Sequence, residues 1–194
     1  MAAFTKIAIM RAFESLLSTR QVEKITVKDI TDQCGISRNT FYYHYQDIYE
    51  VLKAYVDDSL DEAILFLQKE KEKEKDQDHI CEKAVKQLES HRSLFENLMR
   101  SIKNEEVRNI LDVSSKRFFD YVIDSISEEI DASPQDKELI SSMCQHGVRG
   151  LMIEWLSREN ASSQSLSDLL MRANYLFNGV IVMALKRSEQ RSRL

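Results

Sequence analysis

The chain has 194 residues, of which 43% are hydrophobic and 30% charged, so its composition fits a globular protein of one or two domains and excludes a disordered chain. One proline and four glycines leave long uninterrupted segments, which favours an all-helical (all-α) fold. The net charge of −5 argues against nucleic acid as a partner, but residues 1–46 hold six basic and four acidic side chains, so a mildly basic head precedes an acidic body.

Three helices are predicted in the first part of the chain. The first spans approximately residues 5–18. Thr26 and Asp29 have the spacing of a capping box, which starts a short second helix. Gly35 follows where a left-handed cap is needed, and Ser37 is the expected N-cap of a third helix. Two short helices joined by a glycine turn form a helix-turn-helix.

A long fourth helix is predicted to begin near Asp47 and to continue into the alternating charges of residues 69–75. We interpret these charges as a solvated helix end supported by side-chain pairs, and the alternative is a tail that binds a partner. Further amphipathic helices are expected at residues 79–100, 104–130, 135–158 and 166–187. The expected architecture is a helix-turn-helix head (residues 1–46) joined by the long helix to a helical body (residues 47–194).

Other sequence features bear on the cellular compartment of the protein. The N-terminus lacks a secretory hydrophobic region, and the charge-free stretch at residues 173–185 is too short to span a bilayer. Cys34, Cys81 and Cys144 are odd in number and widely spaced, which argues against a disulfide framework. A cytoplasmic protein without a membrane partner is therefore expected.

The third helix is rich in aromatic and polar side chains. Phe41 and Tyr45 share one helical face, which we expect to pack against the second helix. The outward surface then consists of Arg38, Asn39, Thr40, Tyr42, Tyr43 and His44. These groups suit phosphate oxygens and base edges, since arginine can read guanine and asparagine can read adenine. The alternative is a helical hairpin whose aromatic rings complete a core or an interface.

Residues 26–45, TVKDITDQCGISRNTFYYHY, resemble the DNA-binding signature of TetR-family transcriptional regulators. The resemblance covers roughly the first quarter of the chain, and residues 147–156 are weakly similar to a region of dihydroxyacetone-utilisation regulators. It implies a ligand-responsive regulator, more often a repressor, that binds a palindromic double-stranded DNA operator as a homodimer. It also implies a small-molecule effector, which the sequence does not identify. The expected DNA-binding residues are Thr26, Lys28, Ser37, Arg38, Asn39, Thr40, Tyr42, Tyr43 and His44.

One position departs from the family pattern. Many members have a phosphate-binding lysine where this chain has Ile48. Either Lys28 or Lys6 replaces that charge, or the contact with DNA is weakened or altered.

The last two helices are the expected dimer interface. Gly147, Gly150 and Gly179 each cost about 1 kcal/mol inside a helix relative to alanine, and close packing in a dimeric four-helix bundle would explain them. Packing within a single chain is the alternative. The candidate effector-binding residues, for which ordinary core positions are the alternative, are Phe66, Phe95, Met99, Phe118, Tyr121, Met143 and His146.

No enzyme, metal or cofactor is expected. His79 with Cys81, and Cys144 with His146, are two residues apart, which places each pair on different faces of a helix. An acid–base pair, a nucleophile with its base and a phosphate-binding glycine loop all lack a recognisable arrangement. The alternative function is a helical, dimeric small-molecule sensor or protein-interaction module that has lost DNA binding.

Overall fold

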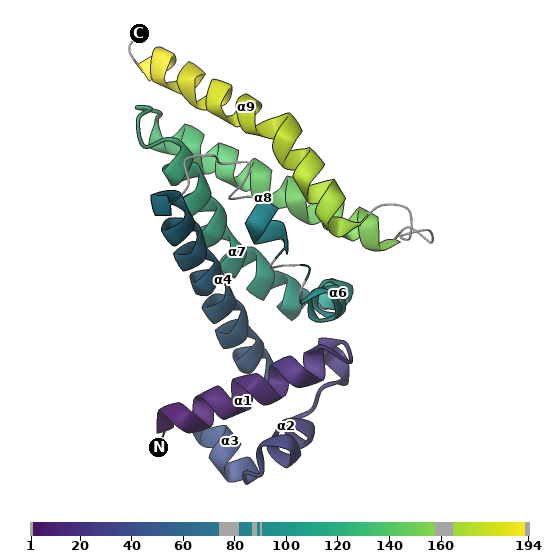
Figure 1. The fold of residues 1–194 in the computed structure, drawn as a ribbon. Coiled ribbons are helices and arrows are strands. Elements are labelled where there is room, and N and C mark those ends of the chain that lie inside the picture. The colour runs from purple at the N-terminus through teal and green to yellow at the C-terminus, as the bar shows by residue number, and fades with distance from the viewer. Residues whose placement is uncertain (1, 74–81, 87–88, 90, 158–164, 193–194) are drawn as a thin grey trace. The chain divides into compact units, whose positions relative to one another are not determined.

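The computed structural model describes residues 2–73, 82–86, 89, 91–157 and 165–192 (Figure 1). All regular elements in these ranges are helices, which confirms the predicted all-α fold. The chain divides into two compact units: unit 1 contains residues 1–60 and 90–114, and unit 2 contains residues 61–89 and 115–194. Unit 1 thus includes more than the head of residues 1–46, and the functional division after residue 46 stays a prediction.

Unit 1 holds the helix-turn-helix together with segments that come much later in the chain. Its elements are α1 (Ala2–Leu17), the 3-10 helix η1 (Val22–Lys24), α2 (Val27–Cys34), α3 (Arg38–His44), the first half of α4 (Ile48–Lys73), α6 (Arg92–Arg100), the 3-10 helix η2 (Ser101–Lys103) and the start of α7 (Glu105–Ile126). A buried apolar core joins them, to which Ile9, Phe13, Leu17, Ile30, Phe41, Tyr45, Val51, Leu52, Leu94, Leu98 and Val107 contribute.

The local signals around α2 and α3 form as predicted. In the capping box, the Asp29 N–H donates to Thr26 Oγ1 at 3.2 Å and the Thr26 N–H donates to Asp29 Oδ2 at 2.9 Å. Gly35 ends α2 with φ 65°, a left-handed conformation that glycine adopts without a steric penalty. Ser37 Oγ accepts the Thr40 N–H at 3.1 Å and caps α3.

The predicted continuous helix over residues 79–100 is wrong in its described part. His91 is a turn residue and α6 begins only at Arg92, while residues 79–81 lie outside the described residues. The predicted helix is interrupted because the chain passes from unit 2 to unit 1 in this segment. Val85 is buried and belongs to unit 2, whereas Leu94 and Leu98 are buried in the core of unit 1.

Unit 2 consists of the second half of α4, residues 82–86 and 89, most of α7, α8 (Pro134–Ser157) and α9 (Leu166–Ser192). Lys71 Nζ lies 2.7 Å from Glu128 Oε2, and Arg117 Nη2 lies 2.9 Å from Asp61 Oδ1, so ion pairs link its part of α4 to α7 and the turn after it. α8 and α9 pack together and lie side by side in Figure 1.

Serine side chains cap the starts of α8 and α9. Ser133 Oγ accepts the Asp136 N–H at 3.2 Å, ahead of α8. At α9, Ser165 Oγ accepts the Asp168 N–H at 2.9 Å and an Asp168 carboxylate oxygen accepts the Ser165 N–H at 3.4 Å. The predicted boundaries of both helices are therefore correct at their first turns.

Of the helices described, α9 alone is long and apolar enough to cross a membrane by length and composition, over Leu166–Arg191. The sequence analysis took only the charge-free residues 173–185, whereas α9 also includes residues 166–172, whose charged side chains are Asp168 and Arg172. Only 6% of its apolar window is buried within the single chain. The rest of the described chain therefore leaves most of this apolar length uncovered.

Candidate nucleic-acid interface

Two buried anchors orient α3. Phe41 and Tyr45 are buried in the core of unit 1, as their shared helical face predicts. The Tyr42 ring packs edge-on against Phe41, with 5.5 Å between the ring centroids. Because Ser37 caps the helix and these rings fix its inner face, the outer face of α3 has a defined orientation in unit 1.

The outer face of α3 presents the predicted polar and aromatic groups. Tyr43 is 81% exposed and Tyr42 is 55% exposed, so both phenol groups are accessible. Arg38 and Asn39 are exposed, whereas Thr40 and His44 are half-buried. The Tyr43 and His44 rings contact each other edge to face, with centroids 5.0 Å apart. The structure therefore places these six residues on one short helix that faces solvent.

The remaining predicted DNA-binding residues lie at the starts of α2 and α3. Thr26, Lys28 and Ser37 are exposed. The Thr26 hydroxyl also donates to Asp29 Oδ2 at 2.7 Å, so it helps to fix the start of α2. Hydrogen bonds from Thr26, followed by the positive charge of Arg20, lower the pKa of Asp29 and keep this cap ionised. Contact between any of these residues and DNA stays a prediction.

Ile48 is half-buried at the first position of α4 and packs against the unit 1 core. Asp47 caps this helix, because its Oδ1 accepts the N–H groups of Tyr49 at 2.8 Å and Glu50 at 2.9 Å. Glu50 Oε2 accepts the Gln46 N–H at 2.6 Å. Carboxylates rather than a cation thus occupy the start of α4.

The seven candidate effector-binding residues are divided between the two units, and their role in effector binding stays a prediction. Phe95 and Met99 belong to unit 1, and the others belong to unit 2. Met143 is 66% exposed and His146 is also exposed, with its Nδ1 2.7 Å from the Ser142 carbonyl oxygen. Phe66, Phe118 and Tyr121 are half-buried. Aromatic or sulfur-containing character alone did not reveal which helical face each residue would occupy.

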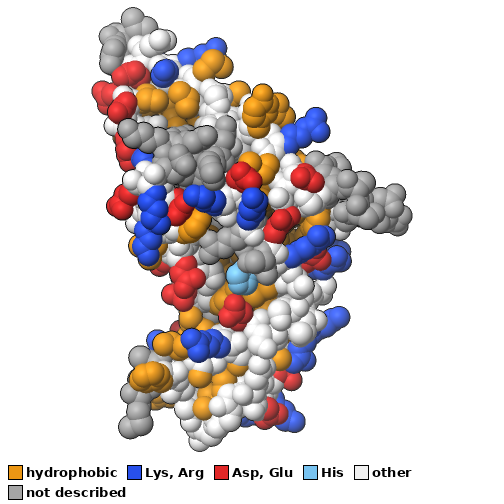
Figure 2. All heavy atoms as spheres, viewed as in Figure 1, with side chains coloured by type: hydrophobic (Ala, Val, Ile, Leu, Met, Phe, Trp, Pro, Cys, Tyr) orange, Lys and Arg blue, Asp and Glu red, His pale blue; other side chains and the backbone are white. Residues whose placement is uncertain are grey.

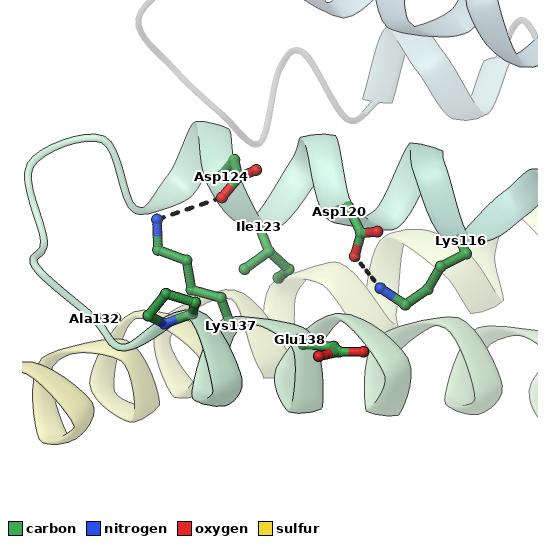
Figure 3. A pocket seen from close by; sticks show the side chains of 8 residues that line it. Lys116, Asp120, Ile123, Asp124, Ala132, Lys137 and Glu138 are labelled. Atoms are coloured by element: carbon green, nitrogen blue, oxygen red, sulfur yellow. Dashed lines mark hydrogen bonds and ion pairs between the residues drawn. The ribbon is translucent and has the colours of Figure 1, made fainter.

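Unit 2 has an open pocket of about 460 Å³ between α7 and α8, which contains none of these seven residues (Figure 3). Lys137 Nζ lies 3.3 Å from Asp124 Oδ1, and Lys116 pairs with Asp120. Ser141 donates to the same Asp120 carboxylate at 2.5 Å. Both lysines that line the pocket are therefore already paired with carboxylates. Its lining residues are Lys116, Asp120, Ile123, Asp124, Ala132, Pro134, Lys137 and Glu138.

Among the described residues, no group of three or more histidine, cysteine or acidic side chains is placed to hold a metal ion. Cys144 is half-buried, whereas His146 on the same helix is exposed. His79 and Cys81, the other pair considered, lie outside the described residues.

The fold and the exposed face of α3 define a helix-turn-helix protein. Comparison with family models identifies it further: residues 9–55 match the model described as bacterial regulatory proteins, tetR family. Residues 75–175 match a model described as a transcriptional regulator C-terminal region. The chain belongs to the TetR family of DNA-binding transcriptional regulators.

Solved structures share this fold at low sequence identity. The dihydroxyacetone kinase operon activator DhaS is 19% identical with a TM-score of 0.60, and the match covers 95% of this chain and 98% of DhaS. NalD, the secondary repressor of the MexAB-OprM multidrug efflux pump in Pseudomonas aeruginosa, is 19% identical with a TM-score of 0.58 and the same coverages. RolR in complex with resorcinol is 16% identical with a TM-score of 0.55, covering 96% of this chain and 95% of RolR. No curated protein sequence matches the chain.

Proposed function

We propose that the protein represses transcription by binding a palindromic operator as a homodimer and leaves it when a small molecule binds the body. The observation that carries the DNA-binding part is the outer face of α3, where Arg38, Asn39, Tyr42 and Tyr43 are exposed on the second helix of a capped helix-turn-helix. In such motifs the second helix enters the major groove. Repression follows because an occupied operator excludes polymerase.

An exposed apolar surface on α8 and α9 supports the homodimer. Hydrophobic side chains are exposed over α9 in Figure 2. Contiguous apolar surface exposed to water marks interaction sites in soluble proteins. We name it the α8–α9 face and define it by Leu139, Met143, Ile153, Tyr175, Leu176, Phe177, Val180 and Met183.

The helical glycines also support this dimer. A Cβ atom built on Gly147, Gly150 or Gly179 would meet no atom within 4 Å in the described part of the chain. Close packing inside one described chain therefore does not require these glycines. A second copy packed against the α8–α9 face would supply the close approach that justifies their cost of about 1 kcal/mol each.

Effector control is the second part of the proposal. RolR, which shares the fold, has been solved with resorcinol, and NalD is named as a repressor, whereas DhaS is named as an activator. We assign DNA binding to residues 1–46, and effector binding and dimerisation to residues 47–194. We also propose that the protein is cytoplasmic and has no enzymatic activity. The two DNA-binding heads of the dimer must be spaced to match the two operator half-sites. Effector binding would shift the population toward dimers whose head spacing does not match.

Selection from fragmented genomic DNA at low salt tests the proposal. The expected result is an enriched palindrome whose binding weakens steeply with salt, because phosphate contacts release counterions. Tyr42→Phe with Tyr43→Phe should weaken binding to all sequences similarly, because phenols that anchor phosphates carry no base information. Arg38→Ala should also relax the base preference, by about 1–3 kcal/mol at the position that it reads.

A second candidate function is favoured by one observation. Ile48 packs against the core where many relatives place a phosphate-binding lysine, which fits a dimeric sensor or protein-interaction module that no longer binds DNA. If the selection recovers no enriched palindrome and the protein is not retained on DNA at low salt, this second function replaces the first.

A further inference from the structure

Lys6 lies beside the C-terminal end of α3, although it is far from that helix in sequence. Its Nζ is 5.6 Å from the centroid of the Tyr45 ring, within the range of a cation–π contact. Tyr45 is the C-cap residue of α3 and is itself buried. The N-terminal part of α1 lies next to α3 in Figure 1. The buried ring therefore holds an exposed ammonium group at one end of the proposed recognition helix.

This end of α3 has no other lysine or arginine close to it in sequence. Arg38 stands at the first position of the helix, and the next such residue is Lys53. Lys53 Nζ pairs with Asp57 Oδ2 at 2.5 Å on α4. His44 is six positions after Arg38, which is about 9 Å along a helix axis, so Arg38 lies at the opposite end of α3.

Lys6 is available to an external anion. It is exposed, and its ammonium group forms no ion pair with any residue that the structure describes. Negative charges also act near this end of α3. Burial, followed by the negative charges of Glu50 and Asp58, raises the pKa of Tyr45, so both carboxylates act on this end of the helix.

We propose that Lys6 binds a phosphate of the operator backbone and so holds the C-terminal end of α3 against the duplex. This inference rests on the proposed DNA-binding function and extends the DNA-binding surface onto α1. A lysine–phosphate contact carries no base information, so Lys6 strengthens binding and sets the position of α3 without changing which sequence is preferred.

The test compares Lys6→Gln, Lys6→Arg and Arg11→Gln on one duplex that the wild-type protein binds. Arg11 is exposed on the same helix, and five residues place it about 140° round the axis from Lys6, so Arg11→Gln makes the same charge change on another face. Glutamine has nearly the helix propensity of lysine and arginine, so α1 should be retained.

The slope of log K against log salt should become shallower by about 0.9 for each copy of Lys6 that contacts DNA in the Lys6→Gln variant. Lys6→Arg should keep the wild-type slope, Arg11→Gln should change it much less than Lys6→Gln, and all variants should select the same base sequence. Equal slope changes in Lys6→Gln and Arg11→Gln would show only a diffuse charge effect and would overturn the proposal.

The role of Lys6 and the proposed function fail in different ways. A lower melting temperature for Lys6→Gln with an unchanged salt slope would show that Lys6 only supports Tyr45, and this would overturn the contact with phosphate. A wild-type protein that binds no duplex at low salt would overturn the regulator function and the Lys6 proposal together.

Discussion

Ile48 shows how one side chain can serve the fold and limit the DNA contact. It is half-buried, packs against the core of unit 1 and stands at the first position of α4, directly after the carboxylate cap of Asp47. The partial burial expected for an apolar residue at the start of an amphipathic helix is therefore present. We predict that the exposed edge of Ile48 faces DNA.

Ile48→Lys separates the two roles of this position. The lysine stem can keep part of the packing while its ammonium group reaches solvent, so we expect a cost of about 1 kcal/mol and a melting temperature lower by about 2–4 °C. If the edge faces DNA, binding should tighten on every sequence and the salt slope should steepen by about 0.9. Thermal denaturation and salt-dependent binding measure both effects, and a destabilised variant with an unchanged slope would contradict the DNA-facing assignment.

The sequence predicted which side chains are buried and which are exposed where this depends on the repeat of a single helix. The inner positions of Phe41 and Tyr45 and the outer positions of Tyr42 and Tyr43 follow from the helical repeat. The candidate effector-binding residues were harder, because a pocket depends on how several helices pack. Met143, for example, is an apolar residue at helical spacing, yet it lies on the exposed α8–α9 face.

At the scale of elements, signals confined to a few residues predicted helix starts well. The capping box at Thr26 and the N-cap at Ser37 involve residues three apart, and both form in the structure. The packing of α6 and η2 with the start of the chain has no such signal. It depends on contacts between residues about 80 apart, such as Asn97 with Leu17 and Ser101 with Val22. The sequence therefore did not predict that residues 90–114 belong to unit 1.

Asn97 and Ser101 bind both ends of the link between α1 and η1. Asn97 Nδ2 donates to the Leu17 carbonyl at 2.9 Å, and Ser101 Oγ accepts the Val22 N–H at 3.0 Å. Ser101 also donates to the Asn97 carbonyl at 2.8 Å, so the two residues form one connected network. Ser101 is buried, which makes these hydrogen bonds costly to lose.

Asn97→Ala should lower the free energy of unfolding by about 1–3 kcal/mol, because the Leu17 carbonyl loses its side-chain donor. This corresponds to a melting temperature lower by about 2–4 °C for each kcal/mol. Ser93→Ala is the matched control, since Ser93 is exposed on the same helix. Thermal and denaturant unfolding by circular dichroism measure the difference, and equal losses in the two variants would rule out a role for the Asn97 hydrogen bond.

For the whole molecule, charge and apolar surface are divided along the chain. Residues 1–46 are mildly basic although the net charge of the chain is −5, so the remainder is acidic. An acidic body repels DNA, which favours approach through the head. The α8–α9 face lies in unit 2, so the proposed dimer interface and the proposed DNA-binding surface occupy different units.

Phe177→Glu tests the proposed dimer. Phe177 is 56% exposed in the single chain, so a charge there is tolerable in a monomer, whereas in the dimer it would be buried without a partner. A two-fold interface contains the substitution twice, so even 1.4 kcal/mol per copy would weaken the dimer about a hundredfold. We expect a monomer or insoluble protein, with weaker operator binding in either case.

Lys186→Glu is the control for this variant. Lys186 is exposed on α9, and nine residues place it about half a turn round the helix from Phe177. Its substitution should leave the dimer intact, because its charged head already stands in water and away from the α8–α9 face. Sedimentation equilibrium of the two variants gives their association states, and operator binding gives the functional consequence. A soluble, fully dimeric Phe177→Glu protein with unchanged DNA affinity would place the interface elsewhere on the molecule.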